Sequence, residues 1–246
     1  MSIYTNRIQS LDLGLFDAIS SQTTNDDRGS LLLLQRCIRD SGPYVYLEIG
    51  SHLGGSIQPY YIDPLCKLIY SIDKRPLVQP DQRGKYYEYP ENSSARMMKN
   101  LKQAYSEINP GKVRIFDCDA SEIEPSMITD KPAICFIDGE HTDLAVYSDF
   151  QFCLNVCHAD GIIAFHDTQF IFRGIKKIKN QLTNKKIRFK GILLGGSVYA
   201  ILLNKAIAAF SNCLKPFCQN EFKFFKKAQR YMFKTRLRNK FFSVLD

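Results

Sequence analysis

The chain lacks several patterns that would place it in a common class of proteins. No apolar run approaches the roughly 18 residues that a membrane-spanning helix needs, and no basic flank followed by a sustained apolar stretch opens the chain, so we expect neither a membrane span nor a secretory signal. The eight cysteines include no C-x-x-C pair and no zinc or disulfide spacing. We therefore expect reduced cysteines and a cytoplasmic protein. Five cysteines fall in or beside predicted buried elements: Cys66, Cys118, Cys135, Cys153 and Cys157.

The glycine-rich turn near the start of the chain is not that of a dinucleotide site. A buried parallel strand is predicted over residues 44–49, because this short run is mostly apolar, aromatic or β-branched. It breaks at Gly50, and Gly54 and Gly55 follow, so a ligand can approach bare backbone there. The G-x-G-x-x-G spacing that holds a pyrophosphate is missing. Glu48 stands before the first glycine, where it would repel a pyrophosphate but suits a cationic sulfonium or its amino group.

A second acid follows at the distance expected for a nucleoside site. The strand predicted over residues 67–73 ends at Asp73, which follows Gly50 by 23 positions. An acid that binds a ribose from the next strand is expected after roughly 20 positions. The turn and the acid together predict a nucleoside cofactor, although an ordinary α/β protein could carry such a turn without binding one.

Polar side chains also follow two later strands, predicted over residues 133–138 and 161–166. The carboxyl ends of parallel strands form the ligand crevice of an open α/β sheet. We therefore expect these side chains to meet beside Glu48 and Asp73, and packing alone would not explain that gathering. The set comprises Asp138, His141, His166 and Asp167.

The pattern of strands and helices predicts an α/β fold of the Rossmann-like type, with a mostly parallel seven-stranded sheet, an antiparallel last strand and helices on both faces. Helices are expected between the first five strands, and Gly195-Gly196 indicates a two-residue hairpin between the last two. Residues 25–30 are expected to form a loop that leads into a helix. The strands are predicted over 44–49, 67–73, 112–117, 133–138, 161–166, 188–194 and 197–203.

These motifs resemble those of class I S-adenosylmethionine (AdoMet) methyltransferases. The glycine turn resembles their motif I, and Ser71-Ile-Asp73 resembles their ribose-binding segment. The pair Ile137-Asp-Gly-Glu-His141 and Gly161-Ile-Ile-Ala-Phe-His-Asp-Thr168 closely resembles the macrocin O-methyltransferase type, methyltransferase family 24, and more distantly catechol O-methyltransferase. The resemblance runs from about Tyr44 to Asn204.

The resemblance implies a role for each motif. It implies that Asp138 and His141 are catalytic, with His141 as the base that deprotonates the acceptor hydroxyl. It also implies a Mg²⁺ or Mn²⁺ site formed by Asp138, His166 and Asp167. The chain departs from the catechol pattern, in which Asp-Asn stands where this chain has His166-Asp167, and Mg²⁺ prefers oxygen ligands. The implied AdoMet-binding residues are Glu48, Gly50, Ser51, Gly54, Gly55, Ser56, Asp73, Asp119, Ala120, Ser121 and Asp138.

The net positive charge of the chain is confined to its last 42 residues. The formal net charge is +8, and residues 205–246 carry ten Lys and Arg against two acids. A helix over residues 221–242 would gather its basic residues on one face, which predicts contact with an anionic membrane surface. The alternatives are a helix that packs its aromatic face on its own domain or a subunit, and a nucleic-acid contact. The basic face would hold Lys223, Lys226, Lys227, Arg230, Lys234 and Arg238, and the other Phe224, Phe225, Ala228, Tyr231 and Met232.

We therefore predict three regions: an N-terminal helical cap (1–43), an AdoMet-binding methyltransferase domain (44–204) and a basic aromatic tail (205–246). The predicted activity is AdoMet-dependent O-methylation of a sugar, a glycan precursor or another small molecule. A nucleic-acid methyltransferase is the first alternative, but the Asn/Asp-Pro-Pro-aromatic motif of base-methylating enzymes is missing after Asp138. A non-catalytic AdoMet-fold binding protein is the second, against which the intact strand-end acids argue. Nucleic acid is not the expected partner, and a homo-oligomer is left open.

Overall fold

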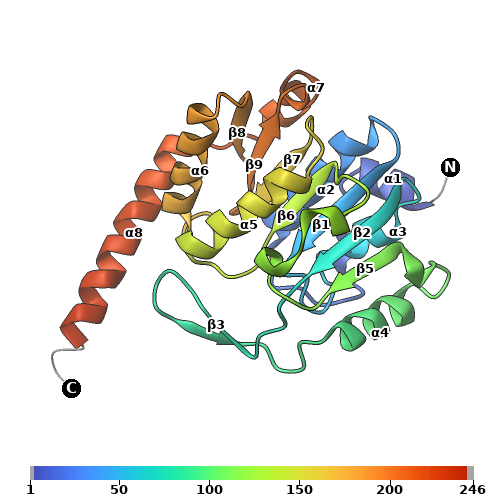
Figure 1. The fold of residues 1–246 in the computed structure, drawn as a ribbon, viewed down its shortest axis with the longest axis horizontal. Coiled ribbons are helices and arrows are strands. Elements are labelled where there is room, and N and C mark those ends of the chain that lie inside the picture. Colours follow the sequence, from blue (N-terminus) through green and yellow to red (C-terminus); the bar gives the residue numbers. More distant parts are fainter. Residues whose placement is uncertain (1–2, 243–246) are drawn as a thin grey trace.

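Seven strands form one sheet through the centre of the molecule, in the order β5-β2-β1-β6-β7-β9-β8 (Figure 1). The computed structural model describes residues 3–242, and the burial of side chains over residues 4–235. β9 runs antiparallel to both of its neighbours, and the other pairs of the sheet are parallel. The predicted sheet is therefore confirmed. Its strands are β1 Tyr44–Ile49, β2 Cys66–Ile72, β5 Val113–Phe116, β6 Ile134–Ile137, β7 Ile162–Phe165, β8 Phe189–Leu193 and β9 Tyr199–Leu203.

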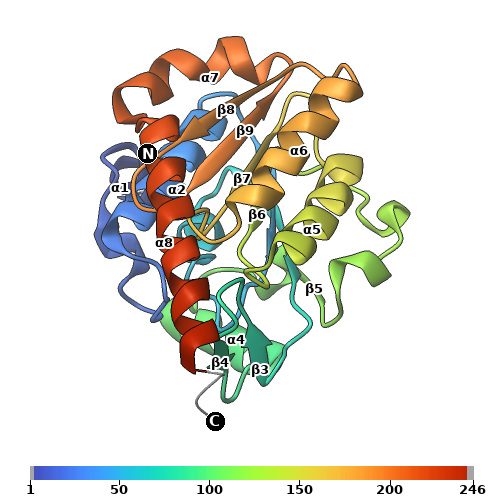
Figure 2. The ribbon, with the colours of Figure 1, turned by 90° about the vertical axis from the view of Figure 1, so that its left-hand side faces the viewer.

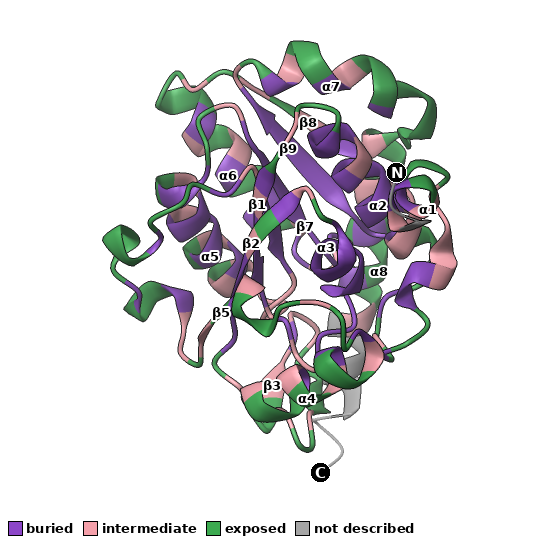
Figure 3. Ribbon diagram, turned by 90° about the vertical axis from the view of Figure 1, so that its right-hand side faces the viewer, coloured by how far each residue is buried: buried purple, intermediate pink, exposed green. Residues whose placement is uncertain are grey.

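Helices cover both faces of this sheet, as predicted. Adjacent residues of a strand point to opposite faces, so Tyr46 of β1 packs on one side and Leu47 on the other. The side chains on both faces are buried, and the central strands are coloured as buried almost throughout in Figure 3. The face of Tyr46 is covered by α1 Ile3–Gln9, α2 Asn25–Arg39, α3 Gln58–Ile62, α4 Ser94–Ala104 and α7 Ala206–Leu214. The other face is covered by α5 Asp143–Val156, α6 Phe172–Asn184 and the start of α8 Glu221–Phe242.

Short 3-10 turns complete the connections, and two of them replace an expected helix. The structure has η3 (Ala120–Glu122) and η4 (Pro125–Met127) between β5 and β6, where we predicted a helix. Prolines at positions 125 and 132 disfavour helical backbone at the residues before them, so this short connection does not form a regular helix. The remaining turns are η1 Leu13–Phe16, η2 Pro110–Lys112 and η5 Lys215–Phe217.

Residues 25–30 form the first turns of α2, so the predicted loop is wrong there. Thr24 is the N-cap, and its side chain accepts from the backbone N–H of Asp27. The Asp27 carboxylate accepts from the backbone N–H of Thr24 in return. This reciprocal capping box begins the helix six residues earlier than the apolar run does.

The loop between β8 and β9 is one residue longer than the predicted two-residue hairpin. The Leu194 N–H donates to the carbonyl of Val198 over 2.9 Å, which leaves three residues in the loop, 195–197. The Ser197 N–H donates to the side chain of Asp27 over 2.8 Å. The contact with α2 holds the loop in a form that the local sequence does not determine.

A small hairpin of β3 (Val78–Pro80) and β4 (Tyr86–Glu88) follows β2 and was not predicted. Its strands are too short and too exposed to show an alternating pattern. Its connecting loop nevertheless docks on the main domain, because the Gln82 N–H donates to the carbonyl of His141 over 2.8 Å. The hairpin therefore helps to position the segment that follows β6.

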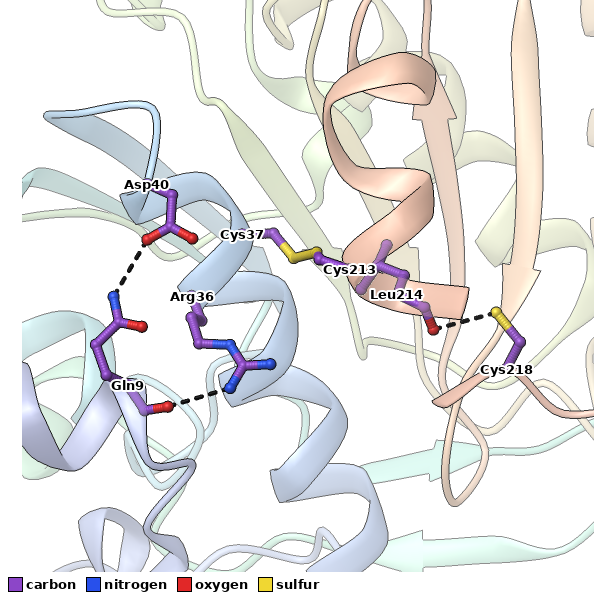
Figure 4. Close-up of a disulfide and its surroundings, with 7 residues drawn as sticks. All are labelled: Gln9, Arg36, Cys37, Asp40, Cys213, Leu214 and Cys218. Carbon is purple, nitrogen blue, oxygen red and sulfur yellow. Dashed lines mark hydrogen bonds between the residues drawn. A yellow bond between two sulfur atoms is a disulfide. The ribbon is translucent and has the colours of Figure 1, made fainter. Parts of the chain in front are cut away.

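Two cysteines form a disulfide, so the prediction that all eight are reduced is wrong. Cys37 of α2 and Cys213 of α7 are joined, although 176 positions separate them (Figure 4). Such a pairing depends on how two distant helices pack and leaves no spacing signal in the sequence. The free cysteines among the described residues include buried Cys66, Cys135, Cys153 and Cys157, as predicted, with Cys118 partly buried and Cys218 exposed.

α8 begins on the domain and then extends beyond it, in line with the predicted helical segment (Figure 1). Ala228 and Met232 are buried, and the Phe225 ring lies 5.8 Å from that of Tyr199. Its start therefore packs on its own domain, while Phe222 and Phe233 are largely exposed. The side chain of Arg238 lies outside the described residues, as do residues 1–2 and 243–246 of the predicted regions. No helix in the described chain is long and apolar enough to cross a membrane.

Candidate active site

Four neighbouring strands end at the same level of the sheet, and a cavity of about 590 Å³ opens beside their ends. The register pairs Ile49 of β1 with Ile72 of β2 and with Ile137 of β6, and Ile137 with Phe165 of β7. The next residue of each strand therefore reaches the same edge, at the point where the strand order reverses around β1. These four residues line the cavity: Gly50, Asp73, Asp138 and His166.

The glycine turn brings the end of β1 against the start of the loop after β6. Gly50 has φ +92°, and a Cβ atom there would collide with the carbonyl of Asp138. Gly55 is equally confined, because a Cβ atom would collide with Ser21 of the N-terminal segment. Gly50, Gly55, Ser51 and Ser56 all line the cavity. The turn needs glycine for close backbone packing in this structure.

Glu48 lies beneath the cavity and is not among the residues that line it. Its side chain is fully buried, and its Oε2 accepts from the Tyr46 hydroxyl over 2.5 Å. The Ser56 hydroxyl donates to its other oxygen. Burial raises the pKa of Glu48 to about 8, against these two hydrogen bonds. The structure thus gives Glu48 a supporting position under Ser56, and the predicted direct contact with a cofactor stays a prediction.

Asp73 stands at the end of β2, and each oxygen of its carboxylate accepts one backbone hydrogen bond. Its Oδ2 accepts from the His52 N–H, and its Oδ1 from the Arg75 N–H, each over 2.8 Å. The Arg75 guanidinium also lies 3.4 Å from Oδ2. A carboxylate has about four acceptor positions, so Asp73 keeps capacity for ligand hydroxyls on the cavity side.

A smaller cavity of about 180 Å³ continues from Gly50 and Asp73 toward the end of β5. The predicted segment from Asp119 to Ser121 lines it, and Asp119 accepts from both the N–H and the hydroxyl of Ser121. Asp149 of α5 also lines it and was not predicted. Burial raises the pKa of Asp149 to about 7. The helical pattern of residues 143–156 does not indicate that Asp149 faces a cavity.

The predicted catalytic residues form one continuous cluster at the ends of β6 and β7. His141 lies between two carboxylates, with Nε2 3.2 Å from Asp138 Oδ1 and Nδ1 3.1 Å from Asp167 Oδ2. His166 Nδ1 lies 2.8 Å from the same oxygen of Asp138. Although burial opposes ionisation, the two imidazoles lower the pKa of Asp138 to about 2. Burial alone would lower the pKa of His141, but Asp138 and Asp167 raise it.

Asp27 belongs to this cluster, and sequence reasoning missed it. Its Oδ2 lies 3.3 Å from His166 Nε2, and its other oxygen accepts from the Ser197 N–H. Burial raises the pKa of Asp27, but the hydrogen bond and charge of His166 outweigh it and hold that pKa far below its usual range. The capping box at Thr24 could have placed Asp27 at a helix N-terminus, but no sequence signal connects that helix with β7.

Three of these side chains can offer donor atoms to one divalent cation. Asp138, His141 and His166 each place one such atom within 4.8 Å of the other two. Two imidazoles and a carboxylate suit Mn²⁺ or another metal that accepts nitrogen better than Mg²⁺. Asp27 contacts the second nitrogen of His166, as carboxylates commonly do beside metal-binding histidines. The residues therefore fit a cation. Asp167 lies outside this group of donors, and its ligand role stays a prediction.

Residues 47–168 match the model of a family described as a methyltransferase domain, methyltransferase family 24. No curated protein matches the chain in sequence. The matched segment begins in β1 and ends just after Asp167, so it contains all the strand-end residues of the cavity.

Solved O-methyltransferase structures share the fold at low sequence identity. NovP has a TM-score of 0.54 and 13% identity, over 71% of this chain and 79% of that chain. CalS11, described as a TDP-rhamnose 3′-O-methyltransferase of calicheamicin biosynthesis, has a TM-score of 0.52 and 16% identity, over 81% of this chain and 93% of that chain. TomG from Streptomyces achromogenes, in complex with SAM, has a TM-score of 0.51 and 12% identity, over 83% of this chain and 91% of that chain. At these identities the similarity shows the fold alone.

Proposed function

This chain belongs to the class I AdoMet-dependent methyltransferases of family 24, and we propose that it methylates a hydroxyl of a sugar or a related small molecule. The observation that carries the proposal is the shared cavity, in which the glycine turn and Asp73 lie on one side and the His141 cluster on the other. A methyl donor bound at the turn would face a histidine that two carboxylates hold in place. The sugar acceptor of CalS11 is consistent with this substrate class.

We assign the donor to the cofactor half of the cavity, which consists of the glycine turn, Asp73 and the smaller cavity. Asp73 would bind the ribose hydroxyls, and the segment from Asp119 to Ser121 would frame the adenine in the smaller cavity. AdoMet supplies a methyl group that its sulfonium already activates. Glu48 acts from below, because it fixes the hydroxyl of Ser56 at the cavity wall.

His141 is the proposed base. A sugar hydroxyl is a weak acid, so a nearby proton acceptor accelerates its attack on a methyl group, typically by 10²–10⁴-fold. Asp167 at Nδ1 orients the imidazole, and the hairpin loop fixes its backbone through Gln82. His141 can then receive the proton at Nε2, with Asp138 3.2 Å away to stabilise the imidazolium.

The competing role for His141 is that of a metal ligand together with Asp138 and His166. A bound divalent cation would lower the pKa of the acceptor hydroxyl. The two roles respond differently to a chelator. Activity that EDTA leaves unchanged assigns His141 as the base, whereas activity that EDTA abolishes and Mn²⁺ restores assigns the cluster as a metal site.

The activity is tested with the full-length protein and methyl-labelled AdoMet. Sugars, glycosides and sugar phosphates serve as acceptors, and the expected product keeps its label in mild alkali, because a methyl ether survives where a methyl ester hydrolyses. Calorimetry with S-adenosylhomocysteine should show binding that Asp73→Ala weakens, and Asp130→Ala, which lines neither cavity, serves as the control. A protein that binds neither AdoMet nor S-adenosylhomocysteine would contradict the proposal, and an alkali-labile product would contradict the hydroxyl.

A further inference from the structure

The start of α8 forms part of the wall of the cavity, together with the strand ends. Phe224, Lys227, Ala228 and Tyr231 all line it, and their spacing of three, one and three residues places them on one face of a helix. Lys227 therefore shares a face with the aromatic residues, and its predicted separation from them is wrong. This face lies outside the segment that matches the family model, which ends at residue 168. The wall is therefore a feature of this chain beyond its methyltransferase core.

Contacts on both sides hold α8 in this position. At its first turn Lys179 of α6 forms an ion pair of 2.5 Å with Glu221, and the Tyr199 hydroxyl donates to the same carboxylate over 3.3 Å. Two turns later the Tyr231 ring lies 6.4 Å from that of Phe170, which follows β7. The view in Figure 2 shows α8 running from the sheet toward the β3–β4 hairpin.

The hairpin meets α8 at Arg83. Its guanidinium lies 3.9 Å from the centre of the Phe170 ring, and a hydrogen bond from Arg83 lowers the pKa of Tyr231. Arg83 is itself paired with Asp81 over 2.5 Å. The hairpin, Phe170 and α8 thus enclose the half of the cavity beyond His141, which we call the acceptor half.

The acidic and basic side chains that line the cavity belong to different elements. Its carboxylates belong to the strand ends and to α2, and they are Asp27, Asp73, Asp138 and Asp167. Of the described residues that line it, Lys227 is the one Lys or Arg. No ion pair with a described residue engages the Lys227 amine, whereas Lys179 and Arg83, which hold α8 and the hairpin in place, are each paired with a carboxylate. An exposed cation and the aromatic rings of Phe224 and Tyr231 thus line the same cavity as the His141 cluster.

On the basis of the proposed function, we propose that the acceptor is a phosphorylated sugar whose phosphate pairs with Lys227. The aromatic rings of Phe224 and Tyr231 offer apolar surface to the sugar ring, and the phosphate would be held at α8 while a hydroxyl reaches His141. Charge also fixes the orientation, because the carboxylates at the strand ends repel a phosphate. A neutral sugar would leave Lys227 without a role in binding.

The test measures binding to full-length protein saturated with S-adenosylhomocysteine. The probes are glucose 1-phosphate, neutral methyl α-glucoside and inorganic phosphate, each titrated by calorimetry at low salt. We expect glucose 1-phosphate to bind at least about tenfold more tightly than either of the others. Lys227→Glu should abolish that preference and Lys227→Gln should reduce it. Lys226→Glu, whose side chain neighbours Lys227 but does not line the cavity, is the matched control and should retain it.

The possible results separate this inference from the proposed function. Equal binding of the phosphorylated and neutral sugars, or an unchanged preference in Lys227→Glu, would overturn the assignment of Lys227. Inorganic phosphate that binds as tightly as glucose 1-phosphate would show a general anion site and overturn the sugar phosphate. If S-adenosylhomocysteine itself fails to bind the wild-type protein, the proposed function fails first. Retained binding of S-adenosylhomocysteine in Lys227→Glu shows that the variant is folded.

Discussion

The two halves of the cavity are built in different ways. The cofactor half comes from the ends of neighbouring parallel strands, where backbone hydrogen bonds fix the relative height of each residue. The acceptor half comes from three separate segments: the β3–β4 hairpin, the loop after β7 and α8. Side-chain contacts such as that between Arg83 and Phe170 hold these segments together. The acceptor half can therefore change its residues without disturbing the strands that place the cofactor.

The largest effect should come from a methyl group in the cofactor half. In Gly50→Ala the new Cβ would collide with the backbone of Asp138, which cannot move without breaking the β1–β6 pairing. We expect a loss of roughly 4 kcal/mol of unfolding free energy, as for other severe backbone and packing defects, and loss of S-adenosylhomocysteine binding. Urea denaturation and calorimetry measure the two quantities.

Gly42→Ala separates that collision from backbone strain. Gly42 also has a positive φ, +108°, but no atom lies within 4 Å of its added Cβ. We expect it to cost only about 1 kcal/mol and to leave cofactor binding intact. Equal losses in the two variants would show that the contact with Asp138 does not define the turn.

The next largest effect should come from His141, which stands where the two halves meet. His141→Gln should lower kcat by roughly 10²–10⁴-fold, because a proton acceptor is lost, while the Kd for S-adenosylhomocysteine stays the same. His158→Gln, exposed outside the cavity, is the control. A tenfold or larger change in cofactor affinity in His141→Gln would place His141 in the cofactor half instead.

The same contrast explains what could be predicted from the sequence. Gly50, Asp73, Asp138 and His166 were found because a strand that ends in a polar residue is a local pattern, and parallel pairing brings such ends together. The five parallel strands of the sheet were found for a related reason, since buried parallel strands are mostly apolar runs.

The missed residues depend on contacts between distant segments. Asp27 reaches His166 only because α2 packs beside β7 and β9, 139 positions away along the chain. The sequence predicts Lys227 on a basic face that contacts an anionic membrane surface, whereas the position of α8 over the cavity comes from packing with Tyr199 and Phe170. The pair Cys37–Cys213 belongs to the same class. Periodicity within one segment holds no information about such partners.

A smaller effect, on the pH dependence of stability, is expected from Glu48, which is buried beneath the cofactor half and does not line the cavity. The pKa of Glu48 is about 8 in the folded protein, above the roughly 4.3 of an exposed glutamate. The folded state therefore holds a proton that the unfolded state releases, and this contribution to stability is complete below about pH 4.3 and is lost as the pH rises toward 8. Glu48→Gln should flatten this decline by up to about 1.4 kcal/mol per pH unit.

Urea denaturation of the wild type and Glu48→Gln at several pH values between 5 and 8 measures this difference. Asp149 has a pKa of about 7 in the folded protein, so it also lowers the stability as the pH rises, over a range that ends near pH 7. The double variant Glu48→Gln with Asp149→Asn should therefore give the flattest dependence of stability on pH. Parallel profiles for the wild type and Glu48→Gln would mean that the Glu48 carboxyl does not hold its proton when the protein is folded.

The smallest expected effect concerns the outer side of the acceptor half. Phe222 and Phe233 are 75% and 64% exposed on α8, among the basic residues Lys223, Lys226 and Arg230. We predict weak binding to vesicles that contain anionic lipid, because each Lys or Arg near such a surface contributes about 1 kcal/mol and exposed aromatic rings enter the interface. Lys223→Ser should therefore weaken vesicle binding about fivefold at low salt.

Lys227 provides the internal comparison for this last prediction, because it faces the cavity and not the outer side of the helix. If the outer side of α8 binds the lipid, Lys223→Ser should weaken vesicle binding and leave the affinity for glucose 1-phosphate unchanged, whereas Lys227→Gln should do the reverse. Vesicle sedimentation and calorimetry on the same two variants give both readings. Vesicle binding that is absent, or that both variants weaken equally, would contradict a lipid-binding role for the outer side of α8.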